Sequence, residues 1–172
     1  HEKERITDEM PQSGAGRTIM TTQPKFVPSE AVEVNIDDSA HLRIRMVDCV
    51  GYMIPGAIGQ NEDGEARMVR TPWYDYDIPF EQAAEIGTRK VIADHATIGI
   101  VMTTDGTIAD IPRENYVAAE ERVVKELKEL GKPFVIILNS ATPEAPEAKA
   151  LCEQLREKYD ASVLLMNVLQ FT

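Results

Sequence analysis

Cysteine and basic residues are both scarce in this chain of 172 residues. The two cysteines, Cys49 and Cys152, have no second cysteine or histidine at metal-ligand spacing, so neither a disulfide framework nor a structural zinc site is expected. Only 18 lysines and arginines face 29 aspartates and glutamates, which gives a formal net charge of −11. Because this charge has the wrong sign for neutralising many phosphates, we expect no nucleic-acid partner.

Long hydrophobic runs are also missing. No apolar stretch approaches the roughly 18 to 20 residues that cross a bilayer, and the first twenty residues are too polar for a secretory signal. These absences predict a cytoplasmic protein with no direct membrane span. Hydrophobic residues make up 43% of the sequence, which is enough at this length for one core. We therefore expect one domain over 1–172.

Prolines and glycines mark two segments without sustained periodicity. The first thirty residues are polar and interrupted by such residues, which predicts an irregular, switch-like loop over 1–30 ahead of an α/β core over 31–172. The segment 51–79 carries seven prolines and glycines together with scattered aromatic residues, which predicts a second long loop.

The remaining patterns predict an α/β fold. Alternating apolar and polar residues over 31–36 and 42–47 are typical of a β-hairpin with one buried face. Amphipathic or continuous apolar patterns predict helices over 80–95, 115–130 and 146–159 and strands over 98–102, 134–138 and 162–168. The order β-α-β-α-β implies right-handed crossovers and a mainly parallel sheet, with the hairpin as an antiparallel edge. We expect a three-layer α/β domain.

A candidate metal ligand lies at the end of the second hairpin strand. Asp48 comes directly after the alternating segment 42–47, and Gly51 comes three residues later. The spacing matches the Walker B and switch segment of P-loop NTPases, in which the carboxylate holds Mg²⁺ and the glycine amide approaches the γ-phosphate. A strand that ends in aspartate before a turn is also common, so a purely structural role stays open.

Two threonines precede the hairpin in the order that such a domain requires. Thr21 and Thr22 lie in the loop segment where switch-type NTPases place a threonine that senses the γ-phosphate and the metal. Threonines in loops are ordinary on their own, but a loop threonine, a hairpin and the Asp48–Gly51 segment in this order favour a nucleotide site.

Polar residues also follow the later strands. Asn139 begins the segment Asn139-Ser-Ala-Thr, at the place where GTPases carry Asn-Lys-x-Asp to read guanine. Because the lysine and the aspartate are absent, the main source of selectivity for guanine is lost, and we expect ATP instead of GTP. The alternative is that Asn139 only forms a turn at the end of the strand. Thr103–Thr107 either lines the same edge or forms an ordinary Asp-Gly turn.

The phosphate-binding loop itself is missing. No G-x-x-x-x-G-K-[ST] motif occurs, and the segment from Pro11 to Thr18 departs from it at the first glycine and at the lysine. Such a loop needs a preceding strand and a following helix, a unit of about 30 residues or more. We therefore expect that the first strand, loop and helix of a P-loop NTPase-like domain are missing from this chain.

Long stretches of the sequence resemble one family. The segments RMVDCVGYMIPGA, EIGTRKVI and TTDGTI, within a match from about Asp8 to Val168, resemble the stage IV sporulation protein A family. This resemblance implies an ATPase domain with a translation-factor GTPase-like fold that uses ATP and Mg²⁺. Thr21 and Thr22 match the family's sensor threonines and Asp48 matches its Walker B aspartate, while the family's Walker A lysine is absent.

The resemblance also implies a biological setting. The family uses ATP hydrolysis to drive self-assembly into a basement layer of the spore coat, on the outer forespore surface within the mother-cell cytoplasm. Its implied partners are copies of itself, other spore coat proteins and a forespore membrane-anchor peptide, contacted through the rest of the parent protein. This chain alone is expected to be inactive. The alternative is a scaffold module that assembles without nucleotide chemistry.

Overall fold

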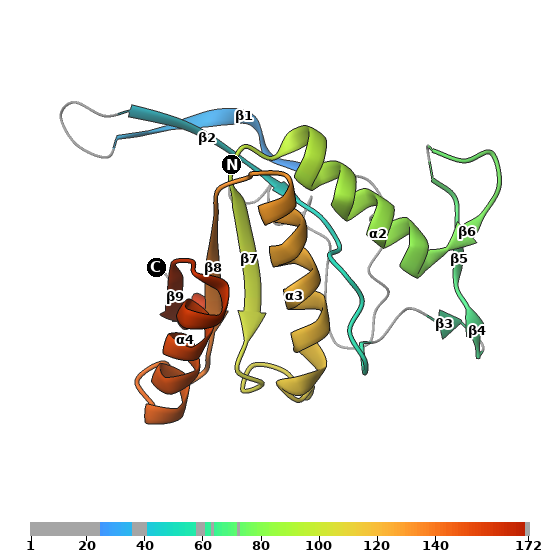
Figure 1. Cartoon of the computed structure of the whole chain (residues 1–172). Helices are drawn as coiled ribbons and strands as arrows, with labels where there is room; N and C mark the ends of the chain where they lie inside the picture. Colours follow the sequence, from blue (N-terminus) through green and yellow to red (C-terminus); the bar gives the residue numbers. More distant parts are fainter. Residues whose placement is uncertain (1–24, 36–40, 58–60, 63, 72, 171–172) are drawn as a thin grey trace. The chain divides into compact units, whose positions relative to one another are not determined.

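The chain forms two compact units. The computed structural model describes residues 25–35, 41–57, 61–62, 64–71 and 73–170 (Figure 1). The first unit comprises His1–Gly51 and Ile58–His95, and the second comprises Tyr52–Ala57 and Ala96–Thr172. None of the helices in these described ranges combines the length and the hydropathy that a bilayer span requires.

A β-hairpin opens the described part of the first unit. Strand β1 (Lys25–Asn35) pairs antiparallel with β2 (His41–Asp48), which confirms the expected hairpin. The register shifts between Val27 and Val32, around Pro28, because proline has no N–H to donate to the ladder. The loop predicted over 1–30 is therefore wrong for 25–30, since this interruption hides the start of a strand; residues 1–24 lie outside the described residues.

The apolar face of this hairpin is not buried. Val32 pairs with Ile44 and Val34 with Leu42, so these four side chains share one face. Their exposed fractions lie between 40% and 49%, which corrects the expectation of one buried face. Alternation identifies a strand with two chemically different faces, but it does not supply the element that covers the apolar one.

The segment 51–79 also contains regular structure that the sequence did not indicate. Two minimal antiparallel pairs occur in it, β3 (Asn61–Glu62) with β4 (Glu65–Ala66) and β5 (Met68–Val69) with β6 (Ile78–Pro79). The prediction of an uninterrupted loop is therefore wrong. Strands of two residues are too short to show a periodic pattern, so only the pairing partner defines them.

Helix α2 follows directly and ends the first unit. It spans Phe80–Lys90 and continues as the π-helical turn η1 (Val91–His95), which together confirm the helix expected over 80–95. Its inward face is formed by small or apolar side chains and one threonine, namely Phe80, Ala83, Ala84, Gly87 and Thr88. Thr88 is 3% exposed, so its hydroxyl must find a partner inside the unit.

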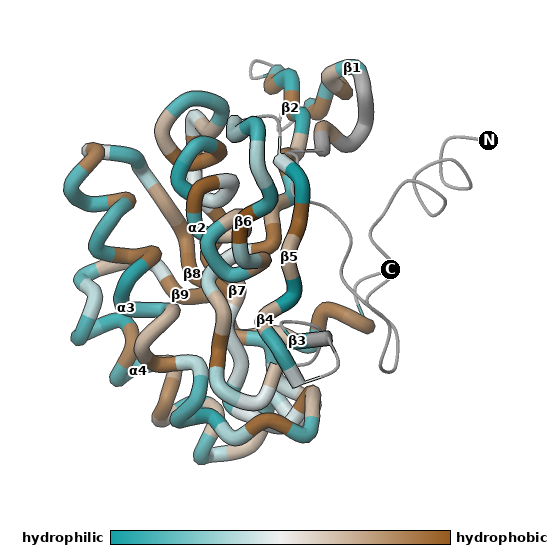
Figure 2. The backbone as a smooth tube through the Cα atoms, turned by 90° about the vertical axis from the view of Figure 1, so that its right-hand side faces the viewer, coloured by the Kyte–Doolittle hydropathy of each residue, from teal (hydrophilic) through white to brown (hydrophobic). Residues whose placement is uncertain are grey.

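The second unit alternates strands and helices as predicted. Its elements are β7 (Gly99–Thr104), α3 (Glu114–Glu129), β8 (Phe134–Asn139), α4 (Pro146–Tyr159), β9 (Val163–Met166) and the short 3-10 helix η2 (Val168–Gln170). Gly131 ends α3 with a φ of 63°, and Pro146 starts α4, where its missing N–H costs nothing. Figure 2 shows hydrophilic and hydrophobic stretches alternating along α3 and α4.

One face of the parallel sheet carries the core of this unit. The strand order is β7-β8-β9, and Val101, Ile136 and Val163 lie side by side in register with exposed fractions of 5% or less. Helices α3 and α4 cover this face through Val124, Leu127, Cys152 and Leu155, which are all buried. On the opposite face Ile100, Met102 and Leu164 are about half exposed.

The hairpin does not join this sheet, contrary to the expectation of an antiparallel edge. Among the described strands, β2 pairs only with β1 and β7 pairs only with β8, so the chain forms separate sheets. Alternation predicts that the two strands of a hairpin pair with each other, but it does not identify a neighbour for the outer edge of either strand. Strands β2 and β7 each have one edge that is unpaired within the described ranges.

Replacing one residue on each face of the sheet tests which face is buried. Ile136→Ala removes a fully buried side chain, and we expect the free energy of unfolding to fall by about 2–5 kcal/mol. Ile100→Ala, on the exposed face of the neighbouring strand, should cost clearly less than the buried substitution. Urea denaturation of both variants measures the difference; equal losses would contradict the assignment of the core face.

Candidate functional site

The carboxyl ends of β7 and β8 place a set of polar residues at one edge of the parallel sheet. Thr104 and Asn139 are register partners at the ends of these strands. The segments that follow, 105–107 and 140–142, therefore start side by side. Because ligands of open α/β sheets bind outside the carboxyl ends of the strands, this edge is the candidate ligand-binding edge of the second unit.

Hydrogen bonds join the two segments across this edge. The backbone amide of Ala141 donates to Thr107 Oγ1 at 2.8 Å, and the Thr107 hydroxyl donates to Asp105 Oδ1 at 2.5 Å. Burial alone would raise the pKa of Asp105, but hydrogen bonds from Ser140 and Thr107 outweigh it and hold the pKa below its ordinary value. The carboxylate of Asp105 thus fixes the loop after β7 to the loop after β8.

Asn139 has a structural partner of its own. Its side-chain oxygen Oδ1 accepts a hydrogen bond of 3.1 Å from the amide of Val168, just after β9. The amide of Ser140 donates to the carbonyl of Met166 at 3.0 Å, which continues the same connection. Asn139 therefore holds the ends of β8 and β9 together, as the turn interpretation of this residue requires; its role toward a nucleotide base stays a prediction.

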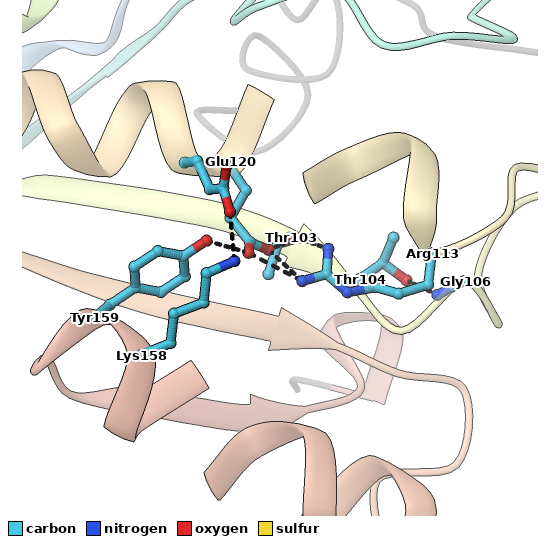
Figure 3. A network of polar contacts seen from close by, with 8 residues as sticks. Thr103, Thr104, Gly106, Arg113, Glu120, Lys158 and Tyr159 are labelled. Carbon is cyan, nitrogen blue, oxygen red and sulfur yellow. Dashed lines mark hydrogen bonds and ion pairs between the residues drawn. The ribbon is translucent and has the colours of Figure 1, made fainter. Parts of the chain in front are cut away.

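A buried ionic network lies behind this edge, between β7, α3 and α4 (Figure 3). The Glu120 carboxylate accepts hydrogen bonds from Thr103 Oγ1 at 2.6 Å, from Arg113 Nη2 at 2.9 Å and from the Tyr159 hydroxyl at 2.7 Å. The side chain of Glu120 is 2% exposed and that of Arg113 is 18% exposed. A buried carboxylate is tolerated because each of its oxygens has donors.

This network holds the start of α3 and the loop after β7. Burial and the hydrogen bond to Glu120 raise the pKa of Tyr159 far above its ordinary range, so the phenol stays a donor. Gly106 approaches the backbone of Arg113 so closely that a Cβ there would lie 3.0 Å from the Arg113 nitrogen, and its φ is 89°. The loop that carries Asp105 and Thr107 is thus anchored at both of its ends.

The first unit holds the other two predicted site residues that the structure describes. Asp48 is the last residue of β2 and is exposed, and no described residue donates a hydrogen bond to its carboxylate. Gly51 has a φ of 81°, and its amide donates to Thr88 Oγ1 on α2 at 3.1 Å. Burial raises the pKa of the neighbouring Cys49 thiol, so this cysteine stays a neutral side chain at neutral pH.

The residues after Gly51 belong to the second unit and are held on α3. The Tyr52 hydroxyl donates to Glu126, and the Arg122 guanidinium lies 4.0 Å from the centre of the Tyr52 ring. Asn115 Nδ2 donates to the carbonyl of Pro55 at 2.8 Å. The chain therefore passes from one unit to the other between Gly51 and Tyr52, with fixed contacts on both sides.

The predicted site residues are thus only partly brought together. Asp48 and Gly51 lie in the first unit and Asn139 in the second, while Thr21 and Thr22 lie outside the described residues. Within the described ranges, no group of three or more histidine, cysteine, aspartate or glutamate side chains could hold a metal. A cation at Asp48 would have this one carboxylate as its ligand from the described ranges. A single carboxylate is typical of Mg²⁺ that is bound mainly by phosphates and water.

Comparison with known proteins identifies the class to which this chain belongs. A sequence profile of the family described as Stage IV sporulation protein A, ATPase domain, matches residues 1–172. The class is therefore that of ATPase domains. The chain belongs to the Stage IV sporulation protein A ATPase-domain family.

Curated relatives cover almost all of this chain. It is 57% identical over 167 residues to Stage IV sporulation protein A of Bacillus subtilis (strain 168), a match that covers 97% of this chain and 34% of that protein. It is 56% identical to the Bacillus anthracis protein, with the same coverage. The Clostridioides difficile (strain 630) protein is 54% identical, over 98% of this chain and 34% of its own length. The chain thus spans about a third of these relatives, and no solved structure matches it.

The lowered pKa of Asp105 predicts a pH dependence of stability. Because the folded-state pKa lies below that of the unfolded chain, the ionised carboxylate stabilises the fold above the unfolded pKa, and this contribution disappears as the pH falls through the folded pKa. The free energy of unfolding of the Asp105→Asn variant should therefore fall less than that of the unaltered chain when the pH is lowered from about 4 to about 2. Urea denaturation at a series of pH values checks this, and parallel pH profiles would contradict it.

Neighbouring glutamates allow a test of the buried network. Glu120→Gln leaves Arg113 without a charged partner in a largely buried site, and we expect a loss of about 2–4 kcal/mol in the free energy of unfolding. Glu121→Gln is the matched control, because Glu121 and its partner Lys158 are about half exposed and such pairs contribute about 0–1 kcal/mol. Thermal and urea unfolding compare the two; similar losses would refute a special role for Glu120.

Proposed function

We propose that residues 1–172 form a nucleotide-binding ATPase domain of a protein that hydrolyses ATP to drive its own assembly into the spore coat basement layer. The observation that carries this proposal is the match of the whole chain to the ATPase domain of Stage IV sporulation protein A. The setting that follows is the outer forespore surface in the mother-cell cytoplasm. Copies of the protein itself, other spore coat proteins and a forespore membrane-anchor peptide are the proposed partners of the full-length protein.

The proposed fold is a three-layer P-loop NTPase-like domain whose first strand, phosphate loop and helix lie outside this chain. Two features support it. The strands β2 and β7 each have one edge with which no described strand pairs, so a further strand could pair there. The sheet face that carries Ile100, Met102 and Leu164 is apolar yet about half exposed, which suits coverage by a further helix layer. On this basis the chain alone binds nucleotide weakly or not at all.

The proposed roles of the residues follow from their chemistry. Asp48 would hold Mg²⁺, which neutralises charge on the transferred phosphoryl group. The Gly51 amide would hydrogen-bond the γ-phosphate, and Thr21 and Thr22 would sense it and orient the attacking water. Asn139 would arrange the loop beside the base. The loop Asn139–Thr142 has no lysine or aspartate for guanine, which favours ATP over GTP.

A scaffold function without nucleotide chemistry is the alternative. The exposed apolar face of the β1–β2 hairpin, with Val32 and Leu42 nearly half exposed, favours it, because such a face suits contact with another protein. Under this alternative, oligomerisation would depend on protein concentration but not on ATP. Sedimentation of the full-length protein with and without ATP separates the two functions.

Calorimetric titration of the full-length protein with ATP and Mg²⁺ tests the proposed function. We expect binding that is selective for ATP over GTP, and weak or no binding by the 172-residue chain alone. Asp48→Asn should weaken Mg²⁺-dependent ATP binding about ten- to hundredfold, because a charged ligand is lost. Asp94→Asn, which alters an exposed aspartate after α2, is the control and should bind normally. Equal affinity of both variants would disprove the role of Asp48.

A further inference from the structure

The amide of Gly51 already has a hydrogen-bond acceptor within the protein. It donates to Thr88 Oγ1 at 3.1 Å, across 37 residues of sequence. At Gly51 a Cβ would meet no atom within 4 Å, so the residue is required by its φ of 81° and not by crowding. The direction of this N–H therefore depends on the backbone conformation at Gly51 and on Thr88.

Thr88 is well placed to fix this direction. It lies on the inward face of α2, is 3% exposed and has a rigid β-branched side chain. The Cys49 side chain forms hydrogen bonds with the same hydroxyl and with the Gly51 amide, but a cysteine sulfur is a weak partner. A buried hydroxyl that is held by two neighbours keeps a defined orientation, so its oxygen presents a fixed lone pair to the Gly51 amide.

We propose that Thr88 is a positioning residue that competes with the terminal phosphate of ATP for the Gly51 amide. The inference rests on the proposed function, in which that amide hydrogen-bonds the γ-phosphate. One N–H donates one strong hydrogen bond, so it cannot serve both acceptors fully. The exchange requires rotation of the Val50–Gly51 peptide, which glycine allows at little cost because it has no side chain.

This competition makes the response specific for the terminal phosphate. ATP offers a charged acceptor that replaces the threonine oxygen, whereas ADP has no γ-phosphate and leaves the Thr88 hydrogen bond in place. Tyr52 follows Gly51 directly and is held on α3 by Glu126 and Arg122. The peptide that rotates therefore directly precedes the point where the chain enters the second unit.

Thr88→Val in the full-length protein tests the inference, because valine keeps the shape of threonine and removes the acceptor. The Gly51 amide then keeps only its weaker contact with the Cys49 sulfur, so we expect ATP to bind about fivefold more tightly while the affinity for ADP stays unchanged. Isothermal titration calorimetry gives both dissociation constants. Amide hydrogen exchange at Gly51, measured with ADP bound, should be faster in the variant because the hydrogen bond is lost.

A control variant separates this role from packing. Thr88→Ser keeps the hydroxyl and should retain the unaltered ratio of the two affinities. Equal changes for ATP and ADP in Thr88→Val, or weaker ATP binding alone, would overturn the inference. Absence of ATP binding by the unaltered protein would instead overturn the proposed function and this inference with it.

Discussion

The arrangement of the second unit depends on one buried carboxylate. Glu120 is taken out of water inside the unit, and an unpaired charge in such a place is costly enough to unfold a marginally stable protein. Its donors come from β7, from the start of α3 and from the last residue of α4. These elements therefore keep their relative positions, because a shift of any one of them leaves the carboxylate without a donor.

The carboxyl ends of β7 and β8, which form the candidate ligand-binding edge, are held in place by the same network. Arg113 directly precedes the helix that carries Glu120, as its N-cap residue, and Gly106 packs against the backbone of Arg113. Asp105 and Thr107 extend the chain of contacts to the loop after β8, and Asn139 extends it to the segment after β9. The three loops at this edge are thus fixed to one another before any ligand contact. Preorganised loops of this kind lower the entropic cost of binding.

Elements with a strong local pattern were predictable, whereas the partners of buried polar groups were not. Helix α3 follows from its apolar stripe and from Gly131 and Pro133, and the position of Asn139 follows from the end of an apolar strand. By contrast, a glutamate within an amphipathic helix is usually exposed, and the burial of Glu120 depends on Tyr159, 39 residues away. The contact of Thr88 with Gly51 joins residues that are 37 positions apart in the sequence. No local period encodes such contacts.

The step from Gly51 to Tyr52 is one of three points at which the chain passes between the two units that carry the predicted site residues. Asp48 and Gly51 are positioned by β2 and α2, and Asn139 by the parallel sheet. Gly51 is held by its hydrogen bond to Thr88, and Tyr52 is held by its hydrogen bond to Glu126 on α3. Neighbouring residues of this segment are therefore held on different helices, Gly51 on α2 and Tyr52 on α3. Such a segment is suited to transmit a local change between elements.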